Sequence, residues 1–457
     1  MSVLLEDKFS VNVGKRRKDF KVTLSQKSLL LQPVDILASR KIELAHENVI
    51  TTKLLLTDPD SPQDCLFRVV YCLVPKIKCQ VYEFYPHSDT REPEKLAALW
   101  VASLQKTFSL PIKVRSHQLL FVVDEGHGMH LYEKVQPMFD ACGYNHELME
   151  VTAKGQVLKR LKSEPKINRF GGIVVIANES LLAEVLSGIH SRDEWKCLLQ
   201  TISIGLIPIG GVLGLSQSLS SLQRGSHHRA DPTLAGIFNC LRGRTAPVDL
   251  FRLEGHNLKT LGVSNLGFGI LPDIAKESQG CCKCWIQSWR ILNLRRHSFR
   301  IAYLPYLTSE NKFESIISKE HLELDNQLPD GIQGDLPPGW ISEENDFIGV
   351  HVTNLPFLDD RRSLVPNAKM NDGILWLFLI RSLTSRADLR TFLNGLKRRE
   401  VPPLDGIDAI KIRAFRIEPL CEARADQEYT FDGQDLAFST VQGHVLPSGC
   451  RLMCDRY

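Results

Sequence analysis

The sequence predicts a protein of the α/β plus β class, in which an α/β lobe is preceded by a small β-rich region and followed by an antiparallel β-sandwich lobe. Three observations lead to this prediction. Strand-like runs fill most of the N-terminal part, strands alternate with helices from Gln118 to Ile209, and strands dominate again after Val248. At about 150 residues per domain, a chain of 457 residues holds two to three domains. We expect the domains at 1–112, 113–246 and 247–457.

The N-terminal part is predicted to be β-rich because short apolar runs alternate with polar turns. A helix should follow at Glu94–Thr107, where Leu96, Leu99 and Leu104 recur at helical spacing, and it should lead into the next domain. The expected strands are Phe20–Leu24, Ser28–Leu31, Lys53–Leu56 and Phe67–Val74.

The central part should form a parallel sheet with helices on its faces. In such sheets a ligand lies beyond the carboxyl ends of the strands, which points to Asp124–His130, Asn178–Ala183 and Ile209–Ser216. The expected strands are Leu119–Val123, His146–Val151, Gly172–Ala177 and Ile204–Pro208, and the expected helices are Met129–Cys142, Gln156–Leu161 and Leu181–His190.

The C-terminal part should be an antiparallel sandwich, because strand-like runs follow one another and long helices are rare. The polar segment 312–344, interrupted by Pro and Gly, should be a surface loop. The expected strands are Leu261–Gly267, Phe299–Leu304, Phe347–Val352, Ile374–Ile380, Ala409–Glu418, Tyr429–Phe431 and Ala437–Val441.

Composition excludes several classes of protein. Hydrophobic residues make up 43% of the chain and charged residues 24%, which excludes global disorder, collagen and a coiled coil. A formal net charge of +3 gives no support to a nucleic-acid partner. The 12 cysteines are scattered and Met1–Asp7 lacks a signal-peptide pattern, so we expect free thiols and a cytoplasmic protein. Apolar runs such as Ile374–Ile380 are far shorter than the ~20 residues of a membrane span, which leaves peripheral membrane contact open.

Three small motifs at strand ends have a functional and an ordinary interpretation. Gly126-His127-Gly128 and Gly210-Gly211 follow strands, where glycines let a backbone approach a phosphate group. Glu179 follows another strand, where a carboxylate can act as a general base toward a hydroxyl group. Taken one at a time, the ordinary interpretations are favoured: a tight turn for the glycines and a helix cap for the carboxylate.

Cysteine and basic clusters favour ordinary interpretations. Cys281, Cys282 and Cys284 lack a second Cys or His pair at the spacing of a zinc site, so free thiols are the simpler explanation. Two short basic clusters, at Arg295–His297 and Lys397–Arg399, are typical of a solvated surface.

Several longer stretches occur in a recognisable order. They are Phe170–Ile176 with Leu181–Ile189, Ile207–Leu219, Pro247–Asp249, Gly269–Asp273, Gly339–Trp340, Asn371–Gly373, Ala414–Leu420 and Phe431–Gln434. Together they resemble the sphingosine kinase and diacylglycerol kinase catalytic superfamily, and the sphingosine kinases most closely. The resemblance extends from about Leu119 to the C-terminus and implies ATP-dependent phosphorylation, with magnesium, of a primary hydroxyl group on a lipid such as a sphingoid base.

The resemblance also implies roles for individual residues. Glu179 takes the place of the catalytic base, and Asp273 with Ile270 takes the place of the lipid contacts. The implied nucleotide-binding residues are Gly126, Gly128, Asn178, Ser180, Glu184, Gly210, Gly211, Asp432, Gly433 and Gln434.

The chain departs from the family pattern around the nucleotide. The family's Gly-Asp-Gly is Asn178-Glu179-Ser180 here, its Asn-Pro is Val123-Asp124, and its Asp-Gly-Glu is Asp432-Gly433-Gln434. Such losses should compound, because phosphoryl transfer depends on positioning and charge neutralisation. Two hypotheses therefore stand: an active sphingoid-base kinase, and a pseudokinase that binds a lipid or a protein partner of unknown identity without turnover. Ceramide and diacylglycerol remain alternative lipids.

Overall fold

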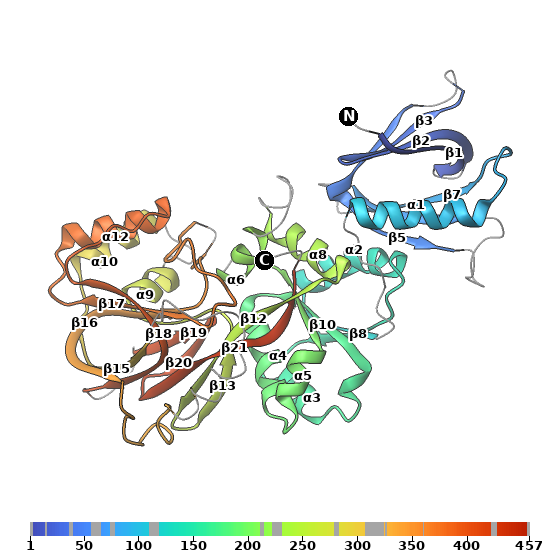
Figure 1. Cartoon of the computed structure of the whole chain (residues 1–457). Helices are drawn as coiled ribbons and strands as arrows, with labels where there is room; N and C mark the ends of the chain where they lie inside the picture. Colours follow the sequence, from blue (N-terminus) through green and yellow to red (C-terminus); the bar gives the residue numbers. More distant parts are fainter. Residues whose placement is uncertain are drawn as a thin grey trace.

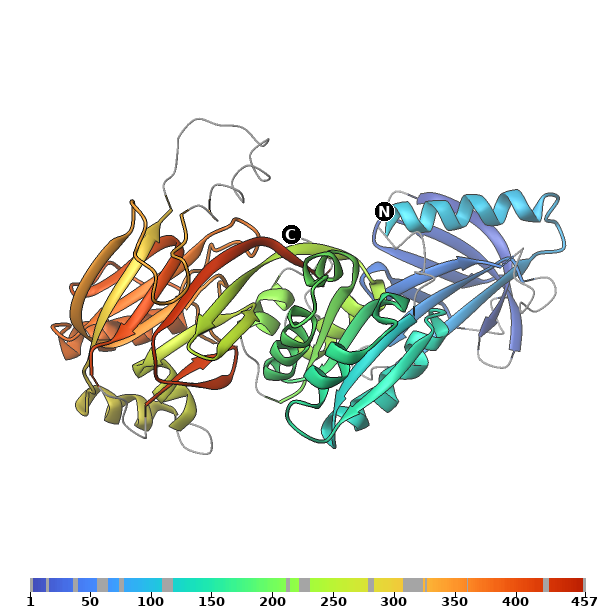
Figure 2. The ribbon, with the colours of Figure 1, turned by 90° about the horizontal axis from the view of Figure 1, so that it is seen from below.

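A computed structural model shows three parts that follow one another along the molecule (Figures 1 and 2). The N-terminal sheet lies at one end, the α/β part in the middle and the strand-rich C-terminal part at the other end. The structure describes residues 3–13, 16–35, 40–55, 65–73, 78–108, 118–210, 214–221, 231–277, 283–306, 324, 327–359, 361–421 and 427–454.

The N-terminal part is an antiparallel sheet covered by one helix, α1 (Pro93–Thr107). Trp100 of α1 lies edge-on to Phe9, with ring centroids 5.4 Å apart, and donates its indole N–H to Asp7. The helix therefore packs back onto this sheet. In spatial order the strands are β4 (Ile42–Ala45), β3 (Ser28–Pro33), β2 (Arg16–Ser25), β1 (Val3–Val13), β7 (Lys78–Pro86), β6 (Phe67–Leu73) and β5 (Val49–Leu54), and a short 3-10 helix spans His46–Asn48.

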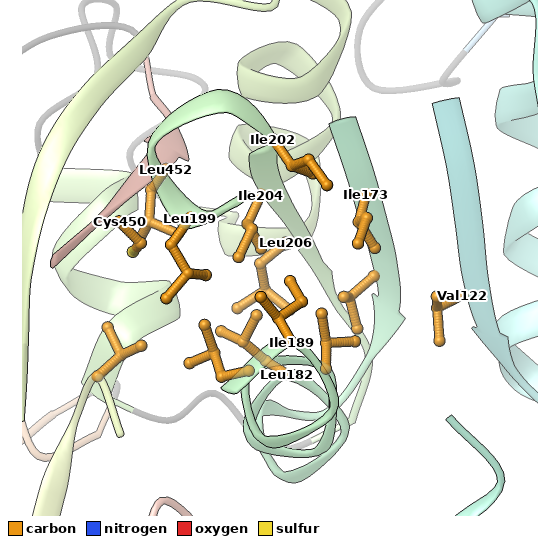
Figure 3. Packing of buried hydrophobic residues seen from close by; sticks show 14 of the residues in the cluster. Val122, Ile173, Leu182, Ile189, Leu199, Ile202, Ile204, Leu206, Cys450 and Leu452 are labelled. Carbon is orange, nitrogen blue, oxygen red and sulfur yellow. The ribbon is translucent and has the colours of Figure 1, made fainter. Parts of the chain in front are cut away.

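The central part has the predicted parallel strands with helices on both faces. The parallel order is β9 (His146–Val151), β8 (Gln118–Asp124), β10 (Phe170–Ala177) and β11 (Ser203–Pro208). Leu182 and Ile189 of α4 point toward Ile204 and Leu206 of the sheet (Figure 3). The helices are α2 (His127–Ala141), α3 (Gln156–Ser163), α4 (Glu179–His190), α5 (Trp195–Thr201), α6 (Gly214–Ser221) and α8 (Pro232–Arg242), with a 3-10 turn at Ile167–Arg169.

The C-terminal part consists of antiparallel ladders with three further helices. Helices α9, α10 and α12 lie together on one side of strands β16–β18 (Figure 1). The elements are β12 (Thr245–Gly255), β13 (Leu258–Gly262), β14 (Asn265–Gly269), α9 (Ile270–Glu277), α10 (Lys283–Leu292), β15 (His297–Pro305), β16 (Ile341–Thr353), β17 (Leu375–Arg381), α12 (Arg386–Arg398), β18 (Ile407–Pro419), β19 (Glu428–Phe431), β20 (Gln434–Ala437) and β21 (Val441–Met453).

The prediction of a parallel sheet followed by a separate sandwich is wrong in one respect: the strands form one continuous mixed sheet. Strand β21 pairs in parallel with β11 and antiparallel with β12 and β18, so it joins the two parts through hydrogen bonds. The cause is the path of the chain, which returns from the C-terminal strands to the edge of the parallel strands at Arg451 and Leu452.

Three local predictions also need correction. Leu261–Gly267 is two strands, because the chain turns at Val263 and Ser264 between β13 and β14. Ala437–Val441 likewise spans the end of β20 and the start of β21. The loop predicted at 312–344 ends at Ile341, where β16 begins; residues 312–323 lie outside the described residues.

No helix in the described ranges is long and apolar enough to span a membrane. Cys281 and Cys282, and the side chain of Cys284, lie outside what the structure describes.

Candidate active site

The carboxyl ends of three neighbouring parallel strands, β9, β8 and β10, open onto one cavity of about 430 Å³. This is the edge of an open α/β sheet where ligands are expected. Four segments line the cavity: the end of β8, the loop after β9, the start of α4, and the turn between β19 and β20. The lining residues are Asp124, Glu125, Val151, Thr152, Ala153, Lys154, Asn178, Ser180, Leu181, Glu184, Gly433, Gln434 and Asp435.

Glu179 is the first residue of α4 and is 4% exposed. Its Oε1 accepts hydrogen bonds from the Ser216 backbone N–H and the Ser216 hydroxyl group, each at 2.8 Å. Asn178 caps the helix, since its side-chain oxygen accepts from the Leu181 N–H at 3.3 Å. Burial raises the pKa of Glu179 to about 7, the hydrogen bonds from Ser216 oppose this rise, and the nearby Asp432 carboxylate adds to it. A carboxylate with such a pKa can exchange a proton near neutral pH.

Asp432 is an anchor for the chain. Its carboxylate accepts three backbone hydrogen bonds, from Val263 at 2.7 Å, Ser264 at 3.0 Å and Asn265 at 2.8 Å, so it fixes the turn between β13 and β14. Burial nevertheless raises the pKa of Asp432 to about 6. Gln434 then links this region to α4, because its side-chain N–H donates to the Ser180 carbonyl oxygen at 2.9 Å.

Glu184 lies one helical turn after Ser180 and has a structural partner. Its Oε1 accepts from the backbone N–H groups of Val157 at 3.1 Å and Leu158 at 3.2 Å, at the start of α3. The carboxylate therefore stabilises the positive end of α3 while it also lines the cavity.

The predicted lipid contacts lie in a different place, on α9 in the C-terminal part. Asp273 has Oδ2 3.6 Å from Nη1 of Arg290 and 4.0 Å from Nη1 of Arg295. Ile270 is buried in a core shared with α12. On the same side of the sheet lies a second cavity of about 610 Å³, whose walls are polar and apolar in nearly equal measure. Its lining includes Leu364, Val365, Ile374, Trp376, Phe378, Val401 and Ile407, together with Asn367, Asp372, Asp408 and Lys411.

Comparison with known proteins finds relatives of the kind that the sequence resemblance indicates. No family model matches the chain. Sphingosine kinase 1 of Arabidopsis thaliana is 27% identical over 310 residues, which cover 65% of this chain and 61% of that protein. Sphingosine kinase 1 of Mus musculus is 24% identical over 345 residues, covering 72% and 88%, and human ceramide kinase is 22% identical over 363 residues, covering 71% and 65%. In sequence the chain is therefore similar to sphingosine and ceramide kinases, and in fold it is similar to a diacylglycerol kinase.

A solved structure supports the superfamily fold. A candidate diacylglycerol kinase from Bacillus anthracis superposes with a TM-score of 0.52 at 16% identity, over 75% of this chain and 99% of that one. The chain spans about 60% of the length of the two plant relatives that it matches.

The glycines that the sequence resemblance assigned to nucleotide binding lie at tight turns or at close contacts with the backbone. Gly126 and Gly210 have φ values of 80° and 84°, which the turns after β8 and β11 require. Gly128 packs against β10, where a Cβ atom would lie 3.1 Å from the Ile176 carbonyl oxygen. None of these three is among the residues that line the 430 Å³ cavity, and Gly211 lies outside the described residues.

The sequence did not single out some residues that the structure brings to the superfamily site. Lys154 and Thr152 follow the end of β9, so the strand-end rule would have found them had it been applied to that strand as well. Ser216 ends one of the segments selected by that rule, but only the fold shows that it holds Glu179. Asp435, which lines the cavity and pairs with Lys276, also comes from the fold.

Proposed function

We propose that this protein is a lipid kinase that transfers the terminal phosphoryl group of ATP to the primary hydroxyl group of a sphingoid base. The observation that carries the proposal is Glu179, a buried carboxylate with a pKa raised to about 7 at the strand edge where the superfamily places its catalytic base. The relatives described above are named sphingosine kinase and ceramide kinase, which agrees with this reaction.

Glu179 would act as the general base. A base is most effective when its pKa is close to the working pH, and burial gives Glu179 that property. Ser216 holds one carboxylate oxygen in place, so the group is already oriented before a lipid hydroxyl group arrives. The carboxylate takes the hydroxyl proton as the lipid oxygen bonds to phosphorus and the bond to the ATP leaving oxygen breaks.

The cavity residues are compatible with ATP that arrives with Mg²⁺. Magnesium prefers oxygen ligands and usually takes one or two carboxylates together with phosphate oxygens and water. Asp124 and Glu125, exposed at the end of β8, offer such oxygens, and Lys154 offers a cation toward phosphate. Among the described residues no group of three or more His, Cys, Asp or Glu side chains forms a metal site by itself. The ion would neutralise charge on the phosphates.

The lipid would lie in the C-terminal part, between residues 247 and 457, with its head group near Asp273 and Ile270. The cavity of about 610 Å³ on the same side of the sheet has apolar lining residues, such as Trp376 and Phe378, against which a hydrocarbon chain could lie. The ATP cavity belongs mainly to the lobe at 113–246.

A second candidate function is a pseudokinase that binds lipid without turnover. One observation favours it: four carboxylates, of Asp124, Glu125, Glu184 and Asp435, line the nucleotide cavity with Lys154 as the single lining cation among described residues. Such a cavity repels ATP unless Mg²⁺ compensates. Asn178 and Ser180 also place side chains where the family has glycines.

We also propose that α10 and α12 make peripheral contact with an anionic membrane. Trp285, Trp289 and Leu292 occupy one face of α10 and are 63%, 40% and 60% exposed. Next to them, α12 exposes Arg386, Arg390, Lys397 and Arg398, and Arg386 donates to the Leu292 carbonyl oxygen at 3.3 Å. Exposed tryptophans beside cations fit an anionic bilayer.

Vesicle sedimentation tests this membrane surface. The Trp285→Ala, Trp289→Ala double variant should bind vesicles of phosphatidylserine and phosphatidylcholine at least about 10-fold more weakly than the unaltered protein. Equal binding would refute the proposed surface.

The kinase proposal is tested with γ-labelled ATP, Mg²⁺ and a panel of sphingosine, ceramide and diacylglycerol. We expect labelled sphingosine phosphate, and a loss of rate of about 10²-fold or more in Glu179→Gln. Glu133→Gln serves as a control, since Glu133 is exposed on α2 and is not among the residues that line the cavity. No labelled lipid with any substrate, in a protein that still binds lipid, would favour the pseudokinase instead.

A further inference from the structure

His351 of β16 is a buried polar side chain that the proposed reaction does not use. Its imidazole is 5% exposed, and neither ring nitrogen has a hydrogen-bond partner among the residues that the structure describes. Burial, with a smaller contribution from the charge of Arg362, lowers the pKa of His351 to about 3. The ring is therefore neutral at physiological pH, with one nitrogen that donates and one that accepts. Buried polar atoms in native proteins are mostly hydrogen-bonded, and an exception can mark a site for a ligand.

The imidazole lies between the sheet and α9. A Cβ atom on Gly267 of β14, the residue opposite His351, would lie 2.8 Å from Nδ1 of His351 and 3.4 Å from the Pro272 ring. The absence of a side chain at Gly267 therefore makes room for the ring. Pro272 directly precedes Asp273, the proposed contact of the lipid head group. His351 thus borders the region where the head group is expected.

His351 lies on the face of the sheet that borders the cavity of about 610 Å³, although it is not itself among the lining residues. His351 pairs with Phe378 of β17 in the antiparallel register, and directly opposed residues have their side chains on one face of a sheet. Phe378 lines the cavity of about 610 Å³. Leu364 and Val365, which also line it, pack in one core with Ile270 and Ile274 of α9. A lipid that extends from Asp273 into this cavity would pass His351.

We propose that His351 is a lipid-selecting residue, whose imidazole forms hydrogen bonds with a hydroxyl or amide group of a sphingoid lipid. The inference rests on the proposed binding of a lipid in the C-terminal part. A hydroxyl group, an amine or an amide N–H near the head of a sphingoid base or ceramide can pair with the neutral ring. Apart from the primary hydroxyl group that both lipid classes carry, diacylglycerol offers only ester oxygens, which accept hydrogen bonds and leave one ring nitrogen unpaired. A sphingoid lipid can therefore gain one more hydrogen bond from the ring than diacylglycerol can, so His351 should favour sphingoid lipids.

The test is a binding assay without ATP, which separates this inference from the kinase reaction. Fluorescent sphingosine, ceramide and diacylglycerol are presented in detergent micelles to the unaltered full-length protein and to His351→Leu. We expect the variant to bind sphingosine or ceramide at least about 10-fold more weakly, while its binding of diacylglycerol stays the same or improves. Its melting temperature should stay the same or rise, because leucine removes two unpaired nitrogens from a buried place.

His297→Leu is the matched control. His297 is also buried, at 8% exposure, but its Nδ1 lies 2.8 Å from the side-chain nitrogen of Gln427. That variant should lose stability and keep its preference among lipids. Unchanged sphingoid binding in His351→Leu, or an equal loss for all three lipids, would overturn the role of His351 alone. Failure of the unaltered protein to bind any lipid would overturn the proposed function as well.

Discussion

Glu179 shows how a buried carboxyl group lowers the stability of the folded protein as the pH rises. Its pKa is about 7 in the folded protein and 4.5 in its ordinary range, so the folded state binds the proton more tightly than the unfolded state. Such a carboxyl group does not change the free energy of unfolding below the pKa of the unfolded state. It lowers that free energy as the pH rises from the unfolded-state pKa through the folded-state pKa. Between about pH 4.5 and 7 the buried charge therefore becomes progressively more costly.

Replacing Glu179 with glutamine should remove this cost. Glutamine keeps an oxygen that accepts from Ser216 and carries no charge. We expect the free energy of unfolding of Glu179→Gln to exceed that of the unaltered protein by about 2–3 kcal/mol at pH 8, and the difference to vanish near pH 4. Urea unfolding at the two pH values measures it. A stability difference that is the same at both pH values would show that Glu179 is not a buried, titrating carboxyl group. As a control, Glu125→Gln at an exposed position should not change the free energy of unfolding at pH 4 or at pH 8.

The sequence indicates the candidate residues Glu179 and Asp432, but it does not indicate which residues form hydrogen bonds with their side chains. The sequence indicates Glu179 because it follows a strand and fits a family block. The structure places it at the start of α4 between Asn178 and Ser180, which line the cavity, but Glu179 is not itself a lining residue. Its partner Ser216 is 37 residues away along the chain, and only the packing of α6 brings the two together. The hydrogen bonds that Asp432 accepts from residues 263–265 depend on contacts between distant turns in the same way.

At the scale of single elements, the position of α9 depends on Gly269, the residue directly before the helix. Gly269 precedes it with a φ of 79°, and a Cβ atom there would lie 2.2 Å from the Ile348 carbonyl oxygen. Only glycine satisfies both conditions, since other residues disfavour this φ and have a side chain that would clash. The start of α9, and with it the position of Asp273, is therefore fixed by a glycine.

Gly269→Ala and Gly155→Ala form a matched pair that tests this account of α9. Gly155, which precedes α3, has nearly the same φ, 80°, and lies in the left-handed region, but has no atom within 4 Å of the place where a Cβ would lie. We expect Gly155→Ala to lower the free energy of unfolding by about 1–2 kcal/mol through backbone strain alone, and Gly269→Ala to lower it by more than about 3 kcal/mol. Thermal or urea unfolding measures both. Equal losses would mean that the contact with Ile348 does not constrain α9.

Element prediction succeeded where one periodicity ran without interruption. The buried strands β10 and β11 are nearly continuous apolar runs and were found within two residues of their bounds. The turn at Val263 and Ser264 divides Leu261–Gly267 into two strands. Gly262, Ser264 and Asn265 are residues typical of turns, and Asp432 from far along the chain stabilises the turn with hydrogen bonds that the local sequence does not predict. Helix α12 was missed although Leu389, Phe392, Leu393 and Leu396 have helical spacing, because the surrounding strands dominated the pattern.

For the whole molecule, the N-terminal sheet and the α/β part share a hydrophobic core. Ile50, Val70 and Cys72 of the N-terminal strands pack in one cluster with Phe121 and Phe139. A backbone contact adds to this, as Arg242 of α8 donates to the Glu47 carbonyl oxygen at 2.8 Å. Adjacent residues of β6 pack in different hydrophobic cores. Val69 packs in the core between the N-terminal sheet and α1, and Val70 packs in the core that the N-terminal sheet shares with the α/β part.

Removing residues 1–117 should therefore destabilise what remains. The fragment 118–457 would expose the apolar surface that the N-terminal strands cover, and surface of this kind causes aggregation. We expect the fragment to be insoluble or to elute in the void volume in gel filtration, under conditions in which the full chain is soluble. A monomeric fragment with the melting temperature of the full chain would show that the shared core contributes little.

The central claim is that the cavity at the ends of β9, β8 and β10 binds ATP for phosphorylation of a lipid bound by the C-terminal part. Melting curves of the full-length protein with ATP and Mg²⁺, and separately with sphingosine, test it most directly, because a ligand that binds the folded state raises the melting temperature. We predict a rise with each ligand. A rise with sphingosine but none with ATP at any Mg²⁺ concentration would contradict the kinase and leave a lipid-binding pseudokinase.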